Sequence, residues 1–159
     1  MQFETLQNRH ETLQGILNDS DLTDSQKITA ILELGLQTFG QDIAIVSQIE
    51  ANDYVVQYCE PAGAIAPGTV FELGTTYCNI TLTFPVPVAI PEMAVSEHNR
   101  HPCYDKFKLE SYIGAKIMDR DQVYGTVNFS SPDKRGAFSR EDRELINQMA
   151  QAINVILHG

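Results

Sequence analysis

The feature that most constrains the fold of this chain is a pair of neighbouring segments, 111–118 and 123–131, that are rich in β-branched and aromatic side chains. A short acidic tetrad at 119–122 joins them, and this pattern is typical of a β-hairpin. A hairpin alone is only marginally stable, so it needs further strands or helices as neighbours. The flanking sequence contains both, which predicts that the hairpin lies at the centre of an antiparallel sheet covered by helices.

The rest of the chain alternates between helical and extended patterns. Capping sequences at 23–26 and 139–142 mark the starts of two amphipathic helices. The other expected elements are a helix at 3–17, a hairpin of strands at 43–50 and 54–59, a short strand at 70–71, a short helix at 75–82, a strand at 88–90 and a short helix that leads into the main hairpin. Together they predict an α+β fold with one antiparallel sheet of about six strands and helices on both faces.

Composition narrows the possible partners and the location. The chain has 159 residues, 43% of them apolar, and a net charge of −10. The apolar content suits one globular domain with its own core, and the negative charge argues against nucleic acid or an anionic membrane as a partner. An apolar run of about 18 residues is missing, so we expect neither a membrane span nor a secretory signal. We therefore expect a cytoplasmic location, with the three cysteines as free thiols.

Apolar residues near both ends recur every three or four positions, as in a coiled-coil seam. The seam residues are Leu6, Leu13, Ile146 and Ile153. They predict a homodimer through the terminal helices. We expect residues 1–21 to form an N-terminal signalling and dimerisation helix, followed by a domain at 22–159 that includes a C-terminal helix at 139–157.

Several motifs of the chain resemble the GAF domain. They are FELGTTYC at 71–78, PVAI at 87–90, HPCY at 101–104 with Phe107, LESYIG at 109–114, YGTVNFSS at 124–131 and FSRED at 138–142. The resemblance spans residues 22–157, and its central hairpin and following helix are the most specific parts. The chain looks like the GAF units of bacterial sensor histidine kinases, as in two-component systems, and of cyclic-nucleotide signalling enzymes.

This resemblance implies a sensory module without catalytic activity. It implies a small-molecule pocket on one face of the sheet. On the other face it implies long N- and C-terminal helices that pack together, dimerise and carry the signal to an output domain in cis or in trans. The expected pocket residues are Thr76, Tyr77, Cys78, Tyr104, Phe107, Tyr112 and Phe129. Aromatic walls with a few polar groups suit a planar organic ligand, while plain core packing of these aromatics is the alternative.

Two ligand classes of similar domains can be compared with the sequence. Cyclic-nucleotide-binding GAF domains carry the motif Asn-Lys-Phe-Asp-Glu, whereas this chain has Asn-Phe-Ser-Ser at 128–131, so a cyclic nucleotide is not supported. Bilin-binding relatives attach the chromophore through a Cys that precedes a His. Cys103 lies at about that position, with Tyr104 in place of the His. A bilin cofactor attached through Cys103 therefore stays an alternative.

Free methionine sulfoxide reductases also use a GAF-like fold, and their redox cycle requires a low-pKa thiolate and a second thiol within disulfide reach. Cys59, Cys78 and Cys103 could supply the thiols, but nothing in the sequence brings them together, so catalysis is not expected. His98, His101 and Cys103 fall within six residues and offer nitrogen and sulfur ligands. A zinc site needs a fourth ligand, so we expect no metal.

A ligand-free dimerisation or protein-interaction module is the last alternative. It keeps the fold and the dimer without a bound small molecule. Polar groups that converge on the pocket would distinguish a sensor from such a module. Thr76, Tyr104 and Asn128 are the candidates for those groups.

Overall fold

The computed structural model describes residues 6–159, with side chains described from residue 8 onward. Its elements are α1 (Leu6–Leu17), α2 (Asp24–Phe39), β1 (Ile43–Glu50), β2 (Asp53–Glu60), β3 (Val70–Glu72), the 3-10 turn η1 (Leu73–Thr75), α3 (Cys78–Thr83), β4 (Val88–Ile90), the 3-10 turn η2 (Met93–Val95), α4 (Pro102–Phe107), β5 (Ser111–Asp119), β6 (Gln122–Ser131) and α5 (Arg140–His158). This order agrees with the prediction from the sequence. Residues 3–5 of the predicted first helix lie outside the described residues. No helix in the described part is long and apolar enough to cross a membrane.

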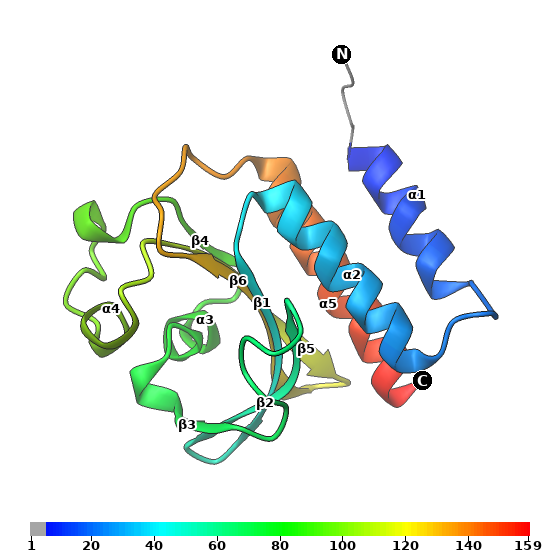
Figure 1. Ribbon diagram of the computed structural model, residues 1–159, viewed down its shortest axis with the longest axis horizontal. Helices are drawn as coiled ribbons and strands as arrows, with labels where there is room; N and C mark the ends of the chain where they lie inside the picture. The colour runs from blue at the N-terminus through cyan, green and yellow to red at the C-terminus, as the bar shows by residue number, and fades with distance from the viewer. Residues whose placement is uncertain (1–5) are drawn as a thin grey trace.

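The strands form one six-stranded sheet in the order β3-β2-β1-β6-β5-β4 (Figure 1). Each pair of neighbours is antiparallel. The hairpin of β5 and β6 occupies inner positions, with Gly114 opposite Asn128, and β1 pairs with the other side of β6. The predicted fold class and the central position of the hairpin are both confirmed.

Helices cover both faces of this sheet. Figure 1 shows α1, α2 and α5 side by side on one face, and α3 and α4 on the other. Side chains of β6 alternate between the two faces, as the pleat of a strand requires. Val127 and Phe129 belong to the core under α2 and α5, whereas Asn128 and Thr126 meet Cys78 at the start of α3. The terminal helices therefore pack together on one face, as the resemblance to the GAF domain implies.

The long helices begin at local capping boxes. The Thr23 hydroxyl accepts the N–H of Gln26 at 3.2 Å, and the Gln26 side chain accepts the N–H of Thr23 at 2.9 Å. Ser139 and Asp142 make the same reciprocal pair at 3.0 and 2.9 Å. These bonds satisfy amide groups that the first helical turn leaves unpaired. Both starts were predicted from the sequence and are confirmed.

The predicted dimer seam is wrong for three of its residues. Leu13, Ile146 and Ile153 are each 0% exposed and belong to the core between helices and sheet of one chain. The side chain of Leu6 lies outside the described part. A spacing of three and four residues is common to a coiled-coil seam and to a helix that packs on helices of its own chain. Here α1 packs on α2 and α5, so the seam residues face helices of their own chain.

Candidate functional site

A small cavity lies between the sheet and the segments around α3 and α4, on the face opposite α1, α2 and α5. Its volume is about 70 Å³. The lining residues are Ile45, Tyr54, Ile65, Phe71, Thr76, Tyr77, Cys78, Cys103, Phe107, Leu109, Tyr112, Asn128 and Ser130. Most of these side chains are aliphatic or aromatic, and none is an acidic or basic residue. The cavity is an apolar space with a few neutral polar groups.

Two wider depressions lie elsewhere on the surface, beside β4 and beside the end of α2, each of about 330 Å³. The one beside β4 is bordered by Val86, which is 63% exposed, and by Phe84, which is 38% exposed. It is an open depression of the surface rather than an enclosed space. The cavity beside α3 is therefore the candidate site.

Most of the predicted pocket residues line this cavity. They are Thr76, Tyr77, Cys78, Phe107 and Tyr112, together with Cys103, the predicted attachment residue. The Tyr77 hydroxyl donates a hydrogen bond to the Leu109 carbonyl at 2.7 Å and thereby ties the start of α3 to the segment before β5. Tyr104 does not line the cavity, because its hydroxyl turns away to donate to Glu110 Oε2 at 2.9 Å.

Phe129 is a correction to the predicted site. It lies on the opposite face of the sheet, 0% exposed, with its ring centroid 5.0 Å from that of Phe39 on α2. The physical reason is the pleat, which sends consecutive side chains of β6 to opposite faces. Asn128 faces the cavity, so Phe129 cannot.

A buried polar network forms one wall of the cavity. Asn128 Nδ2 donates to Tyr54 Oη at 2.9 Å, to Cys78 Sγ at 3.2 Å and to Thr126 Oγ1 at 3.4 Å. The Thr126 hydroxyl also lies 2.8 Å from the Ser47 hydroxyl. Because unpaired polar groups are costly to bury, these mutual bonds stabilise a polar region inside an apolar core. The network joins β1, β2 and β6 to α3.

The helix α3 is held to β5 by the same kind of contact. The Thr81 hydroxyl lies 2.6 Å from Tyr112 Oη, and Cys78 Sγ lies 3.4 Å from that oxygen. The Tyr112 ring also packs edge-on against Tyr77, with 5.4 Å between centroids. A molecule that enters the cavity therefore contacts a helix whose position is coupled to the central strands.

The three cysteines are free and buried. Burial raises the pKa of the Cys103 thiol from 9.0 to about 12, and burial likewise raises the pKa of the Cys78 and Cys59 thiols. A thiolate is the nucleophilic form of cysteine, so a raised pKa makes each thiol unreactive at neutral pH. Cys78 and Cys103 share the cavity, whereas Cys59 is not among its lining residues. Burial therefore lowers the thiolate fraction of both cysteines in the cavity.

The histidines near α4 have structural contacts. Nδ1 of His101 accepts the backbone N–H of Cys103 at 3.0 Å and so caps α4. His98 lies 3.4 Å from the Glu97 carboxylate and edge-on to Phe84. Among the described residues no group of three or more His, Cys, Asp or Glu side chains is arranged to hold a metal ion.

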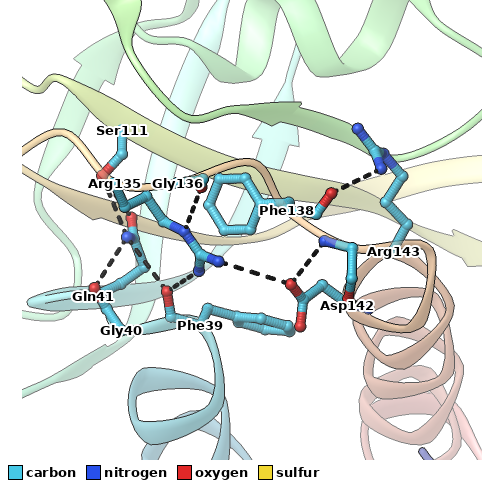
Figure 2. Close-up of polar contacts among 10 residues, drawn as sticks. Phe39, Gly40, Gln41, Ser111, Arg135, Gly136, Phe138, Asp142 and Arg143 are labelled. Carbon is cyan, nitrogen blue, oxygen red and sulfur yellow. Dashed lines mark hydrogen bonds and ion pairs between the residues drawn. The ribbon is translucent and has the colours of Figure 1, made fainter.

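A second polar cluster, centred on Arg135, links the loop after β6 to the long helices. Figure 2 shows that Arg135 donates to the Phe39 carbonyl at the end of α2 and to the Gly136 carbonyl, the latter at 2.9 Å. Its guanidinium lies 3.9 Å from the Phe138 ring centroid and 3.8 Å from the Asp142 carboxylate at the start of α5. One side chain thus joins α2, α5 and the loop between sheet and helix.

Gln41 extends this cluster to the sheet. Its amide nitrogen donates to the Gly40 carbonyl at 3.0 Å and to the Ser111 hydroxyl at 3.1 Å (Figure 2). The Ser111 hydroxyl in turn donates to the Asp133 carbonyl at 2.7 Å. Ser111 is the first residue of β5 and precedes the cavity residue Tyr112. The end of α2 is therefore bonded to the strand that lines the cavity.

Several cavity residues were not predicted from the sequence. Ile45, Tyr54, Leu109 and Ser130 lie in or beside strands and line the cavity. For Ile45 and Tyr54 the alternation along the first hairpin was a usable signal, because each faces the same side as its cross-strand neighbours. The same alternation puts Ser130 on the face of Asn128, two residues earlier on β6. Leu109 carried no such signal. It reaches the cavity because the segment after α4 folds back over the end of β6, where Glu110 N–H donates to the Ser131 carbonyl at 2.8 Å.

A family model described as the GAF domain matches residues 25–157 of the chain. No curated protein matches the sequence. Among solved structures, the GAF domain of a phosphoenolpyruvate-protein phosphotransferase from Acinetobacter is similar, with a TM-score of 0.77 and 12% identity over 99% of this chain and 94% of that chain.

Two further solved structures have a similar fold. The chromophore-binding domain of Stigmatella aurantiaca phytochrome P1 has a TM-score of 0.75 and 12% identity, over 100% of this chain and 62% of that chain. A free methionine-R-sulfoxide reductase from Neisseria meningitidis, solved in complex with its substrate, has a TM-score of 0.73 and 12% identity, over 98% of this chain and 92% of that chain. At such low identity the likeness concerns the fold alone.

Proposed function

The chain belongs to the GAF domain family, a family of regulatory and sensory domains, and on that premise we propose that it is a sensory domain without catalytic activity. A small molecule binds in the cavity beside α3, and its presence changes the arrangement of α1, α2 and α5. The observation that carries this proposal is that the same strands form the wall of the cavity and the floor under the long helices.

Neighbouring residues on the inner strands support this coupling. On β6, Asn128 faces the cavity and Phe129 packs under α2, and on β5, Tyr112 and Ile113 divide in the same way. A strand that shifts to admit a ligand therefore shifts the side chains that support the helices. A ligand acts only through its different affinity for two arrangements of the protein, and these strands belong to both the site and the output.

The Arg135 cluster supplies a second connection. Ser111, next to the cavity residue Tyr112, is bonded to Gln41 at the end of α2, and Arg135 bonds that same helix end and contacts the start of α5. In the proposed mechanism, movement of β5 changes the spacing of α2 and α5 through this cluster. Hydrogen bonds that join rigid elements are the kind of contact that transmits such a change.

The bilin alternative has less support. The phytochrome structure is described as a chromophore-binding domain, which is a statement about that protein. In the present chain, Cys103 is 3% exposed with a protonated thiol, and the cavity of about 70 Å³ is far below the roughly 300 Å³ at which pockets for drug-sized ligands begin. A tetrapyrrole would require the cavity to open widely.

The reductase alternative is weakened by the same thiols. That chemistry requires one cysteine as a thiolate. Burial raises the pKa of all three thiols here, and the structural likeness to the Neisseria reductase, at 12% identity, concerns the fold. We therefore keep the proposal of a domain without catalytic activity.

A ligand-free interaction module is the second candidate function. The observation that favours it is the small volume of the cavity, about 70 Å³, together with a polar network whose buried atoms are satisfied among the described residues. Against it stand the neutral polar residues Thr76 and Asn128 on the cavity wall, as the sensory proposal expects.

The homodimer, the output domain in cis or in trans and the cytoplasmic location belong to the proposal as well. Because Leu13, Ile146 and Ile153 are buried, a dimer formed through the terminal helices would use their outer surfaces, and Val155 on α5 is 53% exposed. Light scattering of the purified chain measures the oligomeric state. A monomer at all concentrations would remove the dimer from the proposal.

Mass spectrometry of the protein purified from its source organism tests the function. A mass excess in the native spectrum that disappears on denaturation supports a reversibly bound small molecule. An excess that survives denaturation and maps to Cys103 replaces the proposal with a covalent chromophore domain. A native mass equal to that of the bare chain supports the ligand-free module instead.

A further inference from the structure

Asn128 Oδ1 and Ser130 Oγ belong to two β6 residues that line the cavity, and neither oxygen has a hydrogen-bond partner among the residues that the structure describes. Asn128 uses Nδ2 for its three bonds to Tyr54, Cys78 and Thr126. Within the described residues, Asn128 Oδ1 and Ser130 Oγ take part in no hydrogen bond, and no fully buried polar side-chain atom there lacks a partner. Both oxygens therefore keep contact with open space. The space that both residues line is the cavity.

These two groups lie side by side. Asn128 and Ser130 are two residues apart on one strand, so their side chains leave the same face of the sheet. Asn128 Oδ1 accepts a hydrogen bond, and the Ser130 hydroxyl donates or accepts one. The pair therefore offers an acceptor and a donor to a single bound molecule. The contacts of Nδ2 with Tyr54, Cys78 and Thr126 hold the Asn128 amide in place beside the cavity.

The cavity is unfavourable for a charged ligand. No Lys, Arg, His, Asp or Glu is among the residues that line the cavity. An ion that enters such a site loses its hydration without gaining a counter-charge, which costs far more than two neutral hydrogen bonds return. Carboxylates, phosphates and ammonium groups are therefore poor ligands for this site.

The size and shape of the cavity set a further limit. Its volume of about 70 Å³ is roughly half of the 150 Å³ of an engineered cavity that holds benzene. The rings of Tyr54, Phe71, Tyr77 and Tyr112 border it. Aromatic faces favour a flat guest that stacks on them or meets their edges.

From these observations we infer that the cavity takes a small, uncharged, planar molecule of about one ring that carries an N–H or O–H group. Its donor bonds Asn128 Oδ1, an adjacent acceptor takes the hydrogen of Ser130, and its apolar edge lies against the aromatic walls. This inference rests on the proposed function and specifies the ligand class of that site.

Three probe molecules test the class. Pyrazole is a flat five-membered ring with an N–H donor beside an acceptor nitrogen, furan is a ring of the same size without a donor, and acetate is a small anion. Each is titrated into the full chain while the backbone amide signals of cavity residues are followed by NMR. Pyrazole is expected to give saturable shifts at Asn128, Ser130 and Tyr112, with furan about fivefold weaker and acetate without effect.

A serine pair provides the matched variants. Ser130→Ala removes the hydroxyl from the cavity, and Ser25→Ala makes the same change on the exposed first turn of α2. Because the Ser130 hydroxyl makes no hydrogen bond with the described residues, the variant is expected to fold with an otherwise unchanged spectrum. Pyrazole affinity should fall about fivefold in Ser130→Ala and stay constant in Ser25→Ala.

Other results overturn the inference. Acetate binding as tight as that of pyrazole, with shifts at the same residues, would contradict an uncharged ligand while leaving a small-molecule sensor in place. Equal affinities of pyrazole and furan would contradict the role of the two oxygens. The absence of cavity shifts with all three probes would remove this ligand class. The proposed function fails separately, when the protein from its source organism shows a bare native mass.

Discussion

Asn128 and Phe129 are consecutive residues of β6 whose side chains end in two different cores. Asn128 Nδ2 donates to Cys78 Sγ at 3.2 Å beside the cavity, and the Phe129 ring meets the Phe39 ring under α2 with 5.0 Å between centroids. The two residues share one planar peptide unit, which moves as a rigid body. In the proposed mechanism, a displacement of Asn128 is therefore transmitted directly to the packing of α2. β6 is in this way a direct connection between the cavity and the helices.

Removal of the Asn128 side chain should destabilise the fold. In Asn128→Ala, the Tyr54 hydroxyl and the Cys78 thiol lose a shared donor, and Tyr54 is only 3% exposed. The free energy of unfolding should fall by about 1–3 kcal/mol, measured by urea denaturation. Asn79→Ala on α3, outside this network, is the control and should change it by less than about 0.5 kcal/mol. Equal losses in the two variants would show that the network does not stabilise the fold.

Substitution of two helical glycines by alanine should have opposite effects on the free energy of unfolding. A Cβ at Gly35 on α2 would lie 2.2 Å from Phe129 Cζ, whereas a Cβ at Gly15 on α1 would have nothing within 4 Å. Gly35→Ala should lower the free energy of unfolding by about 1–3 kcal/mol through overpacking. Gly15→Ala should raise it by about 0.5–1 kcal/mol because alanine favours the helix.

Thermal and urea unfolding measure both changes. A double variant, Gly35→Ala with Phe129→Leu, relieves the clash and should recover part of the loss. A neutral Gly35→Ala would mean that α2 moves away from the sheet at little cost.

The cysteines should resist alkylation in the folded protein. The pKa of Cys103 is raised to about 12, and the pKa values of Cys78 and Cys59 are also raised, in each case mainly by burial. Iodoacetamide at neutral pH should label the native chain far more slowly than the denatured chain, as read by mass spectrometry of each peptide. Rapid labelling of Cys103 in the native protein would support the chromophore and reductase alternatives instead.

The same thiol gives the sign of a pH dependence. Cys103 has a higher pKa folded, about 12, than the ordinary 9.0 that it regains on unfolding. Its effect on stability is constant below pH 9, and the free energy of unfolding falls as the pH rises from about 9 toward 12, since the unfolded thiol loses its proton first. Cys103→Ala should show a shallower fall over this window. Identical slopes would contradict the raised pKa.

Arg135 should be needed for the attachment of α5 to α2. Arg135→Ala removes the bonds to the Phe39 and Gly136 carbonyls and the contact with Asp142. We expect a loss of about 1–2 kcal/mol in the free energy of unfolding and faster hydrogen exchange in the first turns of α5. Arg135→Lys should not restore slow exchange, since an ammonium lacks the planar fork. The neighbouring exposed Lys134 provides the control in Lys134→Ala, and equal exchange in the two alanine variants would contradict this role.

The fold was largely predictable because its signals are local. The capping boxes at Thr23 and Ser139 and the β-branched hairpin depend on residues that are close in sequence. The helical seams were less informative. A stripe that contains Leu13 and Ile153 indicates a buried face but does not say whether a helix of the same chain or of a second copy covers it.

The site was only partly predictable for a different reason. Thr76, Tyr77 and Cys78 were found through the family resemblance, and they do line the cavity. Phe129 was placed there by the same resemblance, as a residue of a strand that faces the pocket, although the pleat puts it and Asn128 on opposite faces. The role of Ser130 could not be recognised, since it depends on which polar atoms the fold leaves without partners.

The central claim is that the state of the cavity determines the arrangement of the helices. Ser130→Leu tests it directly, because the larger side chain fills the cavity as a ligand would, and Arg100→Leu adds leucine at an exposed site on the same side of the sheet. Hydrogen exchange of α2 and α5 is measured by mass spectrometry in both variants. We predict changed exchange in α2 and α5 for Ser130→Leu and native exchange for Arg100→Leu. A change confined to α3, α4 and the strands that line the cavity would contradict the coupling.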